Sequence, residues 1–165
     1  MQLVIAEKPS VAQSIAKVLG ADERKDGYME GNGSIVSWCV GHLVELAQPD
    51  AYSDAWKKWT YDSLPMIPEN WKHEVKKDTV AQYRVLKELM HDTIVDTTVC
   101  ATCTGREGEL IFRLVYEQAG CSKPMKRLWI SSMEESAIRE GFENLKPGSD
   151  YDHLYHSALC RQEAD

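Results

Sequence analysis

The chain has 165 residues and a formal net charge of −7, with 43% hydrophobic and 27% charged residues. This composition predicts a folded domain and excludes a disordered chain. The negative charge disfavours a protein that binds nucleic acid through a broad basic surface. It does not exclude an acidic pocket that meets a phosphate through a bound metal ion.

Neither a membrane span nor a secretion signal is expected. No apolar run approaches the ~18 residues that a membrane helix needs. The first residues, MQLVIAEKPS, contain neither a basic stretch nor a long apolar one. We therefore expect a cytoplasmic protein.

The chain opens with a strand, a charged turn and a helix. Residues 3–6 (LVIA) are a short apolar run typical of a buried parallel strand. Glu7 and Lys8 follow it. A helix is predicted over 9–19 because a proline stands at its first position and a glycine follows its end.

A hairpin and a long loop come next. Residues 28–30 and 34–40 alternate in polarity on either side of a GNG turn, which indicates two antiparallel arms. Residues 47–70 are rich in proline, aspartate and serine and are expected to be irregular. We expect Trp56 and Trp59 to pin this loop to the domain.

The second half of the chain alternates helices and strands. Asp78 or Thr79 is expected to cap a helix. Its predicted inward-facing residues are Ala81, Val85, Leu86, Leu89 and Met90. The predicted elements that follow are a strand over 97–101, a helix carrying Leu110, Ile111, Leu114 and Val115, a strand over 125–130, a helix begun by a capping box at 132–135, a break at 147–148 and a helix over 151–165. This order predicts an α/β fold with a mainly parallel sheet flanked by helices.

Charged turns follow two of the predicted strands, where ligands gather in such folds. One holds Glu7 and Lys8, and the other holds Arg106, Glu107 and Glu109 within ATCTGREGEL. The two glutamates of the second turn are candidates for Mg²⁺ ligands. Stabilisation of the helix dipole by acids in a first turn explains them equally well.

The five cysteines are odd in number and irregularly spaced, which disfavours a disulfide framework. Cys100 and Cys103 form a lone CxxC motif. No second pair supplies the four ligands of a structural zinc site. A thiol redox pair remains an alternative.

Five blocks of the sequence together resemble the type IA DNA topoisomerases, and most closely their topoisomerase III branch. These blocks are VIAEKPSVAQSIAKVLGA, VGHLVEL, CATCTGREGELIFR, RLWISSMEESAIREGF and SALCRQEAD. The resemblance implies that residues 1–147 form a Toprim domain, a Rossmann-like α/β fold. Residues 148–165 would then be a linker and the truncated start of the next, helical domain.

The resemblance also implies roles for individual residues. Glu7 would assist the departing and returning 3′ oxygen of a cut DNA strand, Lys8 would contact the scissile phosphate, and Arg106 would act beside them. The implied metal positions are Glu7, Cys103, Glu107 and Glu109, with Mg²⁺ as the ion. The implied partners are single-stranded DNA and the remaining domains of the enzyme. For His42, in the GHL block, a structural or DNA-proximal role is expected.

The chain departs from the Asp-x-Asp-x-Glu pattern of that family, since the three positions read Cys103, Gly105 and Glu107. A thiol is mostly protonated at neutral pH, and a thiolate is a soft ligand poorly matched to Mg²⁺. We therefore expect weakened Mg²⁺ binding and a relative preference for Mn²⁺ or Cd²⁺.

The family's nucleophilic tyrosine lies beyond residue 165, and none of the seven tyrosines here matches its motif. We expect that this chain alone neither cuts nor relaxes DNA. Three alternatives stay open: another Toprim enzyme such as a primase or nuclease, a non-catalytic binding module with a decayed acidic site, and the redox protein.

Overall fold

The computed structural model describes all residues 1–165 and contains one large sheet, one small sheet and five α-helices. The strands of the large sheet are β1 (Gln2–Ala6), β2 (Glu23–Lys25), β3 (Tyr28–Gly31), β4 (Ser34–Trp38), β7 (Thr97–Ala101), β8 (Met125–Arg127) and β9 (Lys146–Pro147). The small sheet pairs β5 (Val44–Leu46) with β6 (His73–Val75). The helices are α1 (Pro9–Leu19), α2 (Val80–Met90), α3 (Arg106–Gln118), α4 (Glu135–Glu143) and α5 (Asp152–Ala164).

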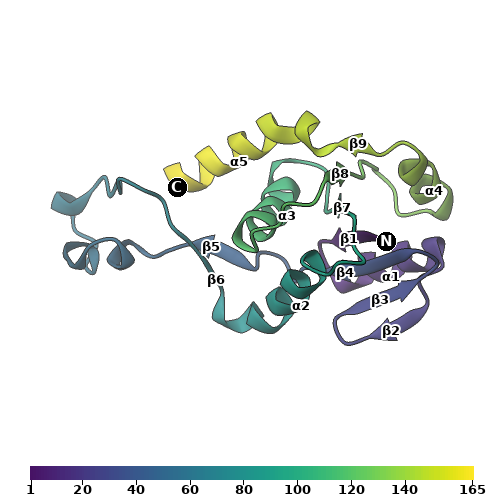
Figure 1. The fold of residues 1–165 in the computed structure, drawn as a ribbon. Helices are drawn as coiled ribbons and strands as arrows, with labels where there is room; N and C mark the ends of the chain where they lie inside the picture. The colour runs from purple at the N-terminus through teal and green to yellow at the C-terminus, as the bar shows by residue number, and fades with distance from the viewer.

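The large sheet has a parallel centre and antiparallel edges (Figure 1). Its strand order is β2-β3-β4-β1-β7-β8-β9. Strands β4, β1, β7 and β8 pair in parallel, and β2, β3 and β9 add antiparallel partners at the two edges. The predicted α/β class with a mainly parallel, helix-flanked sheet is thereby confirmed.

The core lies on both faces of this sheet because successive side chains of a strand point to opposite sides. Leu3 and Ile5 of β1 pack in one cluster with buried residues of α2 and α3. Val4 and Ala6 pack in a second cluster with residues of α1 and α4. The strand is thus buried on both faces, which accounts for its continuously apolar sequence.

Two predicted helix starts differ from the structure in their hydrogen bonds. The Thr79 hydroxyl donates to the carbonyl of Lys76 and, at 3.4 Å, to that of Leu43, and does not cap α2. Ser132 accepts from the Glu134 amide 3.2 Å away, so no capping box forms before α4. In both places the hydroxyl bonds a backbone group of its own turn, Lys76 or Glu134, and Thr79 also reaches the carbonyl of Leu43.

Two other details are also corrected. Ala81 of α2 is exposed, whereas Tyr83 is buried, because the face of α2 that meets the core is formed by Tyr83, Leu86, Leu89 and Met90. Strand β8 ends at Arg127 and does not reach residue 130.

The predicted loop over residues 47–70 contains three short 3₁₀ turns, Pro49–Ala51, Asp54–Trp56 and Tyr61–Ser63. It extends from the small sheet, away from the large one (Figure 1). Trp59 is 68% exposed, so the expectation that it pins the loop down is wrong.

The chain after residue 147 continues as a 3₁₀ turn, Gly148–Tyr151, and then as α5, which lies along α3 (Figure 1). Ala158 of α5 is buried in the same cluster as Leu110 of α3. None of the five helices combines the length and apolar character that crossing a membrane requires.

We predict that Leu86→Ala lowers the free energy of unfolding by about 2–5 kcal/mol, because it leaves a cavity beneath α2. Leu86 is fully buried in the cluster that joins α2 to the sheet. Urea denaturation measures the change. Lys87→Ala, at the exposed neighbouring position, is the matched control and should change stability by no more than about 0.5 kcal/mol. Equal losses in the two variants would contradict the described packing.

Candidate active site

The site begins with the parallel pairing of β1 and β7, which places Ala6 opposite Ala101. Both strands therefore end at the same edge of the sheet. Glu7 leaves β1 there, and the turn containing Cys103 leaves β7 beside it. Strand β4 ends at the same edge, and the Gly41 amide that follows it donates to the Glu7 carbonyl at 3.3 Å.

A hydrogen bond joins the side chains of the two turns. The Cys103 thiol donates to Oε2 of Glu7 at 3.2 Å. The accepting carboxylate and partial burial raise the pKa of the Cys103 thiol above its usual value. At neutral pH Cys103 is consequently a neutral donor that orients Glu7, and the second carboxylate oxygen is left for a further partner.

The GHL block contributes a third side chain to the site. His42 Nε2 pairs with Oε1 of Glu107. His42 is 30% exposed and Glu107 is 73% exposed, so solvent screens this pair and it adds little stability. Its effect is orientation: His42 holds the Glu107 carboxylate at the mouth of the cavity.

A cavity of about 540 Å³ lies between the two turns and α5. Glu7, Cys103, Arg106 and Glu107 all line it, so the structure brings these four predicted site residues together. The other lining residues are Thr104, Gly105, Gly108, Leu110, Ile111, Ala158, Arg161, Gln162 and Asp165. Carboxylates and guanidinium groups thus face one space, a combination suited to a cation and a phosphate together.

Lys8 lies next to this cavity. It lines a smaller hollow of about 280 Å³ that shares Glu7, Cys103 and Thr104 with the first. Lys8 is exposed at the position just before α1. A ligand that carries several phosphate groups can therefore contact Lys8 on one side of Glu7 and Arg106 on the other.

Two glycines shape the turn before α3. Gly105 has φ +123°, a conformation that residues with side chains rarely adopt. An aspartate at position 105 would be strained, which accounts for the glycine at the second position of the acidic pattern. A Cβ on Gly108 would meet the Cys103 carbonyl oxygen at 2.0 Å, so only glycine lets α3 approach the turn.

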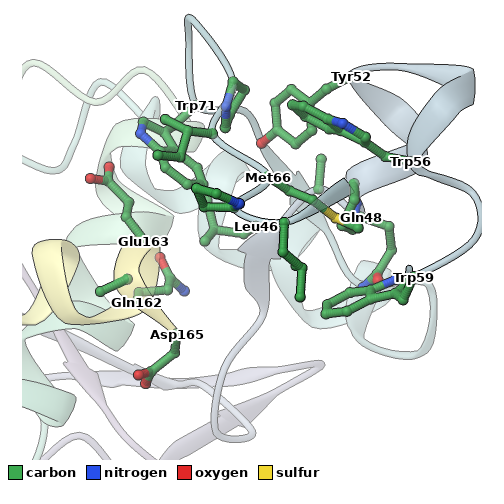
Figure 2. A pocket seen from close by; sticks show the side chains of 17 residues that line it. Leu46, Gln48, Tyr52, Trp56, Trp59, Met66, Trp71, Gln162, Glu163 and Asp165 are labelled. Carbon is green, nitrogen blue, oxygen red and sulfur yellow. The ribbon is translucent and has the colours of Figure 1, made fainter. Parts of the chain in front are cut away.

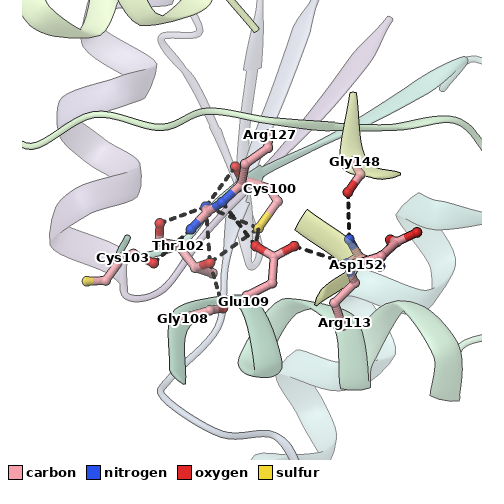
Figure 3. A network of polar contacts seen from close by, with 9 residues as sticks. All are labelled: Cys100, Thr102, Cys103, Gly108, Glu109, Arg113, Arg127, Gly148 and Asp152. Carbon is pink, nitrogen blue, oxygen red and sulfur yellow. Dashed lines mark hydrogen bonds and ion pairs between the residues drawn. The ribbon is translucent and has the colours of Figure 1, made fainter. Parts of the chain in front are cut away.

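The structure gives Glu109 a different place from the expected one. It is fully buried and does not line the cavity. One of its oxygens accepts from Arg113 Nε at 3.0 Å, and the other lies 3.1 Å from Arg127 Nε (Figure 3). Because both oxygens face guanidinium groups, Glu109 has none to offer a metal ion in the cavity. Glu107 and Glu109, two positions apart at the start of α3, point in different directions, which the sequence pattern alone does not reveal.

Cys100, the other cysteine of the CxxC motif, differs from the exposed Cys103 in its burial. It is fully buried, and burial raises the pKa of its thiol to about 11. All five cysteines are free. A buried thiol with a raised pKa is a poor nucleophile, which counts against the redox alternative.

The sequence alone did not show how two residues, His42 and Arg161, contribute to the site. His42 was expected to be structural or DNA-proximal, and its pairing with Glu107 depends on the return of the chain after β4. Arg161 reaches the cavity because α5 packs on α3. The one available signal was its position in the SALCRQEAD block.

A larger cavity, of about 630 Å³, shares Gln162 and Asp165 with the smaller one but is lined by none of Glu7, Arg106 and Glu107 (Figure 2). Aromatic side chains of the 47–71 segment, including Tyr52, Trp56 and Trp71, form it together with the end of α5. Its only ionisable acids are Glu163 and Asp165, and no lysine or arginine lines it. An apolar, weakly acidic groove does not suit phosphate chemistry, so the smaller cavity is the candidate active site.

The residues of the smaller cavity fit a hard divalent cation in part. No three His, Cys, Asp or Glu side chains form a ready-made ligand cluster. Mg²⁺, however, usually takes one or two carboxylates and completes its shell with water and substrate phosphate. Glu7 and Glu107 can supply those carboxylates, with His42 as an outer partner, whereas the protonated Cys103 thiol cannot replace a third.

Comparison with known proteins agrees with this fold. Residues 2–133 match the model of the Toprim domain family. DNA topoisomerase 3 of Bacillus thuringiensis (strain Al Hakam) is 50% identical over 163 residues, which are 99% of this chain and 22% of that protein. DNA topoisomerase 3 of Shouchella clausii is 47% identical over 162 residues, again 22% of its length.

Full-length topoisomerase I from Thermotoga maritima has a similar fold, with a TM-score of 0.66 and 19% identity over 98% of this chain and 23% of that one. The matched fold and the family model define a Toprim-type α/β domain. The chain belongs to the Toprim domain family, and it spans about a fifth of the length of the topoisomerase 3 relatives that it resembles.

We predict that Glu7→Gln lowers the pKa of Cys103, because the carboxylate charge that favours the neutral thiol is removed. Since the thiolate is the nucleophile, alkylation of Cys103 at pH 7.5 should become severalfold faster. The rate is measured against pH by mass spectrometry in a Cys160→Ser background, which removes the other exposed thiol. Glu107→Gln is the control and should leave the rate unchanged. An unchanged pH profile in Glu7→Gln would disprove the thiol–carboxylate contact.

Proposed function

We propose that this chain is the metal-binding, acid/base domain of a type IA DNA topoisomerase III, an enzyme that cuts and reseals single DNA strands. The observation that carries the proposal is the convergence of Glu7, Arg106 and Glu107 on one cavity. Identity of 47–50% to topoisomerase 3 proteins along nearly the whole chain supports it. So do the five sequence blocks, which appear in the expected order.

The proposed roles are those that the resemblance to type IA topoisomerases implies, and the geometry of the cavity supports them. Glu7 exchanges a proton with the 3′ oxygen of the cut strand, because one of its oxygens is held by Cys103 and the other faces the cavity. Lys8 and Arg106, on either side of it, bind the scissile phosphate. Arg161 is a further phosphate contact on the opposite wall.

Glu7 and Glu107 would hold Mg²⁺, with DNA phosphate and water completing its shell. The ion would neutralise charge on the phosphate. Cys103 contributes by orienting Glu7, and it is also a soft ligand available to a thiophilic ion. Glu109 is outside this set, because its carboxylate lies in the buried cluster.

The partners in this proposal are a single-stranded DNA segment and the other domains of the enzyme. Residues 1–147 would be the Toprim domain, and 148–165 the linker and first helix of the next domain. In support, the last strand of the sheet ends at Pro147.

A decayed binding module is the second candidate, and Cys103 and Gly105 are the residues that favour it. Against it, Glu7, Lys8 and Glu107 are all present at the cavities. A different Toprim enzyme, a primase or nuclease, is less well supported because the similarity to topoisomerase 3 extends through the GHL block and α4.

We predict that the chain binds Mg²⁺ weakly and Cd²⁺ more tightly, and that Cys103→Asp reverses this order. A third carboxylate at that position should raise Mg²⁺ affinity by about tenfold. Isothermal titration calorimetry in the Cys160→Ser background measures both ions. Cys103→Ser is the control, since it removes the soft ligand without adding charge and should reduce Cd²⁺ affinity alone. Equal Mg²⁺ affinity before and after Cys103→Asp would refute the assignment.

We also predict that residues 1–165 alone do not relax a negatively supercoiled plasmid. None of the seven tyrosines lines the candidate cavity, so the chain offers no tyrosine nucleophile beside Glu7. Gel electrophoresis after incubation with Mg²⁺ or Mn²⁺ measures relaxation. If the chain relaxes the plasmid and its Glu7→Gln variant does not, a nucleophile exists within this chain and the prediction is wrong.

A further inference from the structure

A buried ion-pair cluster connects the Cys103 turn to the start of α5 (Figure 3). Its members are Cys100, Thr102, Glu109, Arg113, Arg127 and Asp152, which come from β7, the turn after it, α3, β8 and α5. None of them is needed for the chemistry proposed above, and two arginines are costly to bury unless their charges and donors are matched.

The first connection runs from Arg127 to the turn. Its guanidinium donates to the Thr102 carbonyl at 2.8 Å through Nη1 and to the Cys103 carbonyl at 2.8 Å through Nη2. Arg127 is fully buried, so these bonds form in a low-dielectric environment that strengthens them. The planar, forked guanidinium of Arg127 therefore fixes the main chain of Cys103, and the side chain of Cys103 orients Glu7.

The second connection holds Arg127 itself. Glu109 lies between the two arginines and faces the Nε atoms of both. The Arg127 guanidinium also stacks over the ring of Trp129, 5.0 Å from its centroid, and Trp129 stacks on Tyr151 with centroids 5.1 Å apart. Carboxylate and aromatic contacts thus set the plane of the fork.

The third connection reaches the segment after the sheet. Arg113 donates through Nη2 to the Gly148 carbonyl at 2.7 Å and through Nη1 to Oδ1 of Asp152 at 2.9 Å. Asp152 is half-exposed, whereas Arg113 and Glu109 are buried. The two arginines and two carboxylates balance in charge, and the chain of contacts ends at the first residue of α5.

We infer that Arg127 is a positioning residue for the candidate site, and that Glu109, Arg113 and Asp152 couple its position to the segment at 148–152. Displacement of that segment then releases the Cys103 turn and misplaces Glu7. The consequence for metal binding rests on the proposed function of the cavity, whereas the coupling itself does not.

The coupling is tested with a nitroxide label on Cys103 in the Cys160→Ser background, because the other three cysteines are buried. Asp152→Asn removes the charge at the far end of the cluster, at a half-exposed position that tolerates the change. We expect its electron paramagnetic resonance spectrum to sharpen, which reports a more mobile turn. Asp152→Glu should restore the parent spectrum. Asp150→Asn, two residues away and outside the cluster, is the matched control and should not alter it.

Arg127→Lys is the second variant, since lysine keeps the charge but loses the fork and should also sharpen the spectrum. Thermal unfolding confirms that each variant is folded, and Asp152→Asn carries the test if Arg127→Lys does not fold. A spectrum of Asp152→Asn identical to that of the parent would overturn the coupling.

Metal affinity of the unlabelled protein links the coupling to the site. Asp152→Asn should weaken Mn²⁺ binding by about tenfold, the lower end of the effect of removing an outer partner of a metal ligand. A mobile turn with unchanged Mn²⁺ affinity would show that the cluster does not position the site. Because the spectrum needs neither metal nor DNA, it separates failure of the coupling from failure of the proposed function.

Discussion

The parallel pairing of β1 with β7 is the constraint on which the site depends. It brings two strand ends, Ala6 and Ala101, which are 95 positions apart in the chain, to the same edge of the sheet. Side chains that leave those ends must then share one space. The charge and hydrogen bonding of the cavity follow from this pairing, because Glu7 and Cys103 could not otherwise touch.

The sequence predicted the parts of the fold that depend on local patterns. The apolar run of β1, the proline that opens α1 and the glycine that ends it all identify elements that the structure contains. The hairpin of β3 and β4 was predicted for the same reason. The failures concern tertiary choices: the hydroxyls of Thr79 and Ser132 had several backbone partners within reach, and the sequence does not decide among them.

The candidate site also combines features that the sequence predicts with features that only tertiary contacts decide. That Glu7 and Glu107 would lie near each other was predictable, since both follow strands of a parallel sheet. The different fates of Glu107 and Glu109 were not, because a displacement of two positions along a helix turns a side chain from the cavity into the core. The buried arginines 113 and 127, which are far apart in sequence, decide that Glu109 belongs to the core. Cys103 shows how a residue that suits Mg²⁺ poorly can still serve the site, as a neutral donor to Glu7.

The central claim is that one cation lies between the turn after β1 and the turn after β7. Anomalous diffraction from crystals of this chain soaked in Mn²⁺ tests it directly. The account predicts a single strong peak in the cavity, with at least one oxygen from each of Glu7 and Glu107 among the ligands of the ion. A peak bound by only one of these carboxylates, or placed outside the cavity, would contradict it.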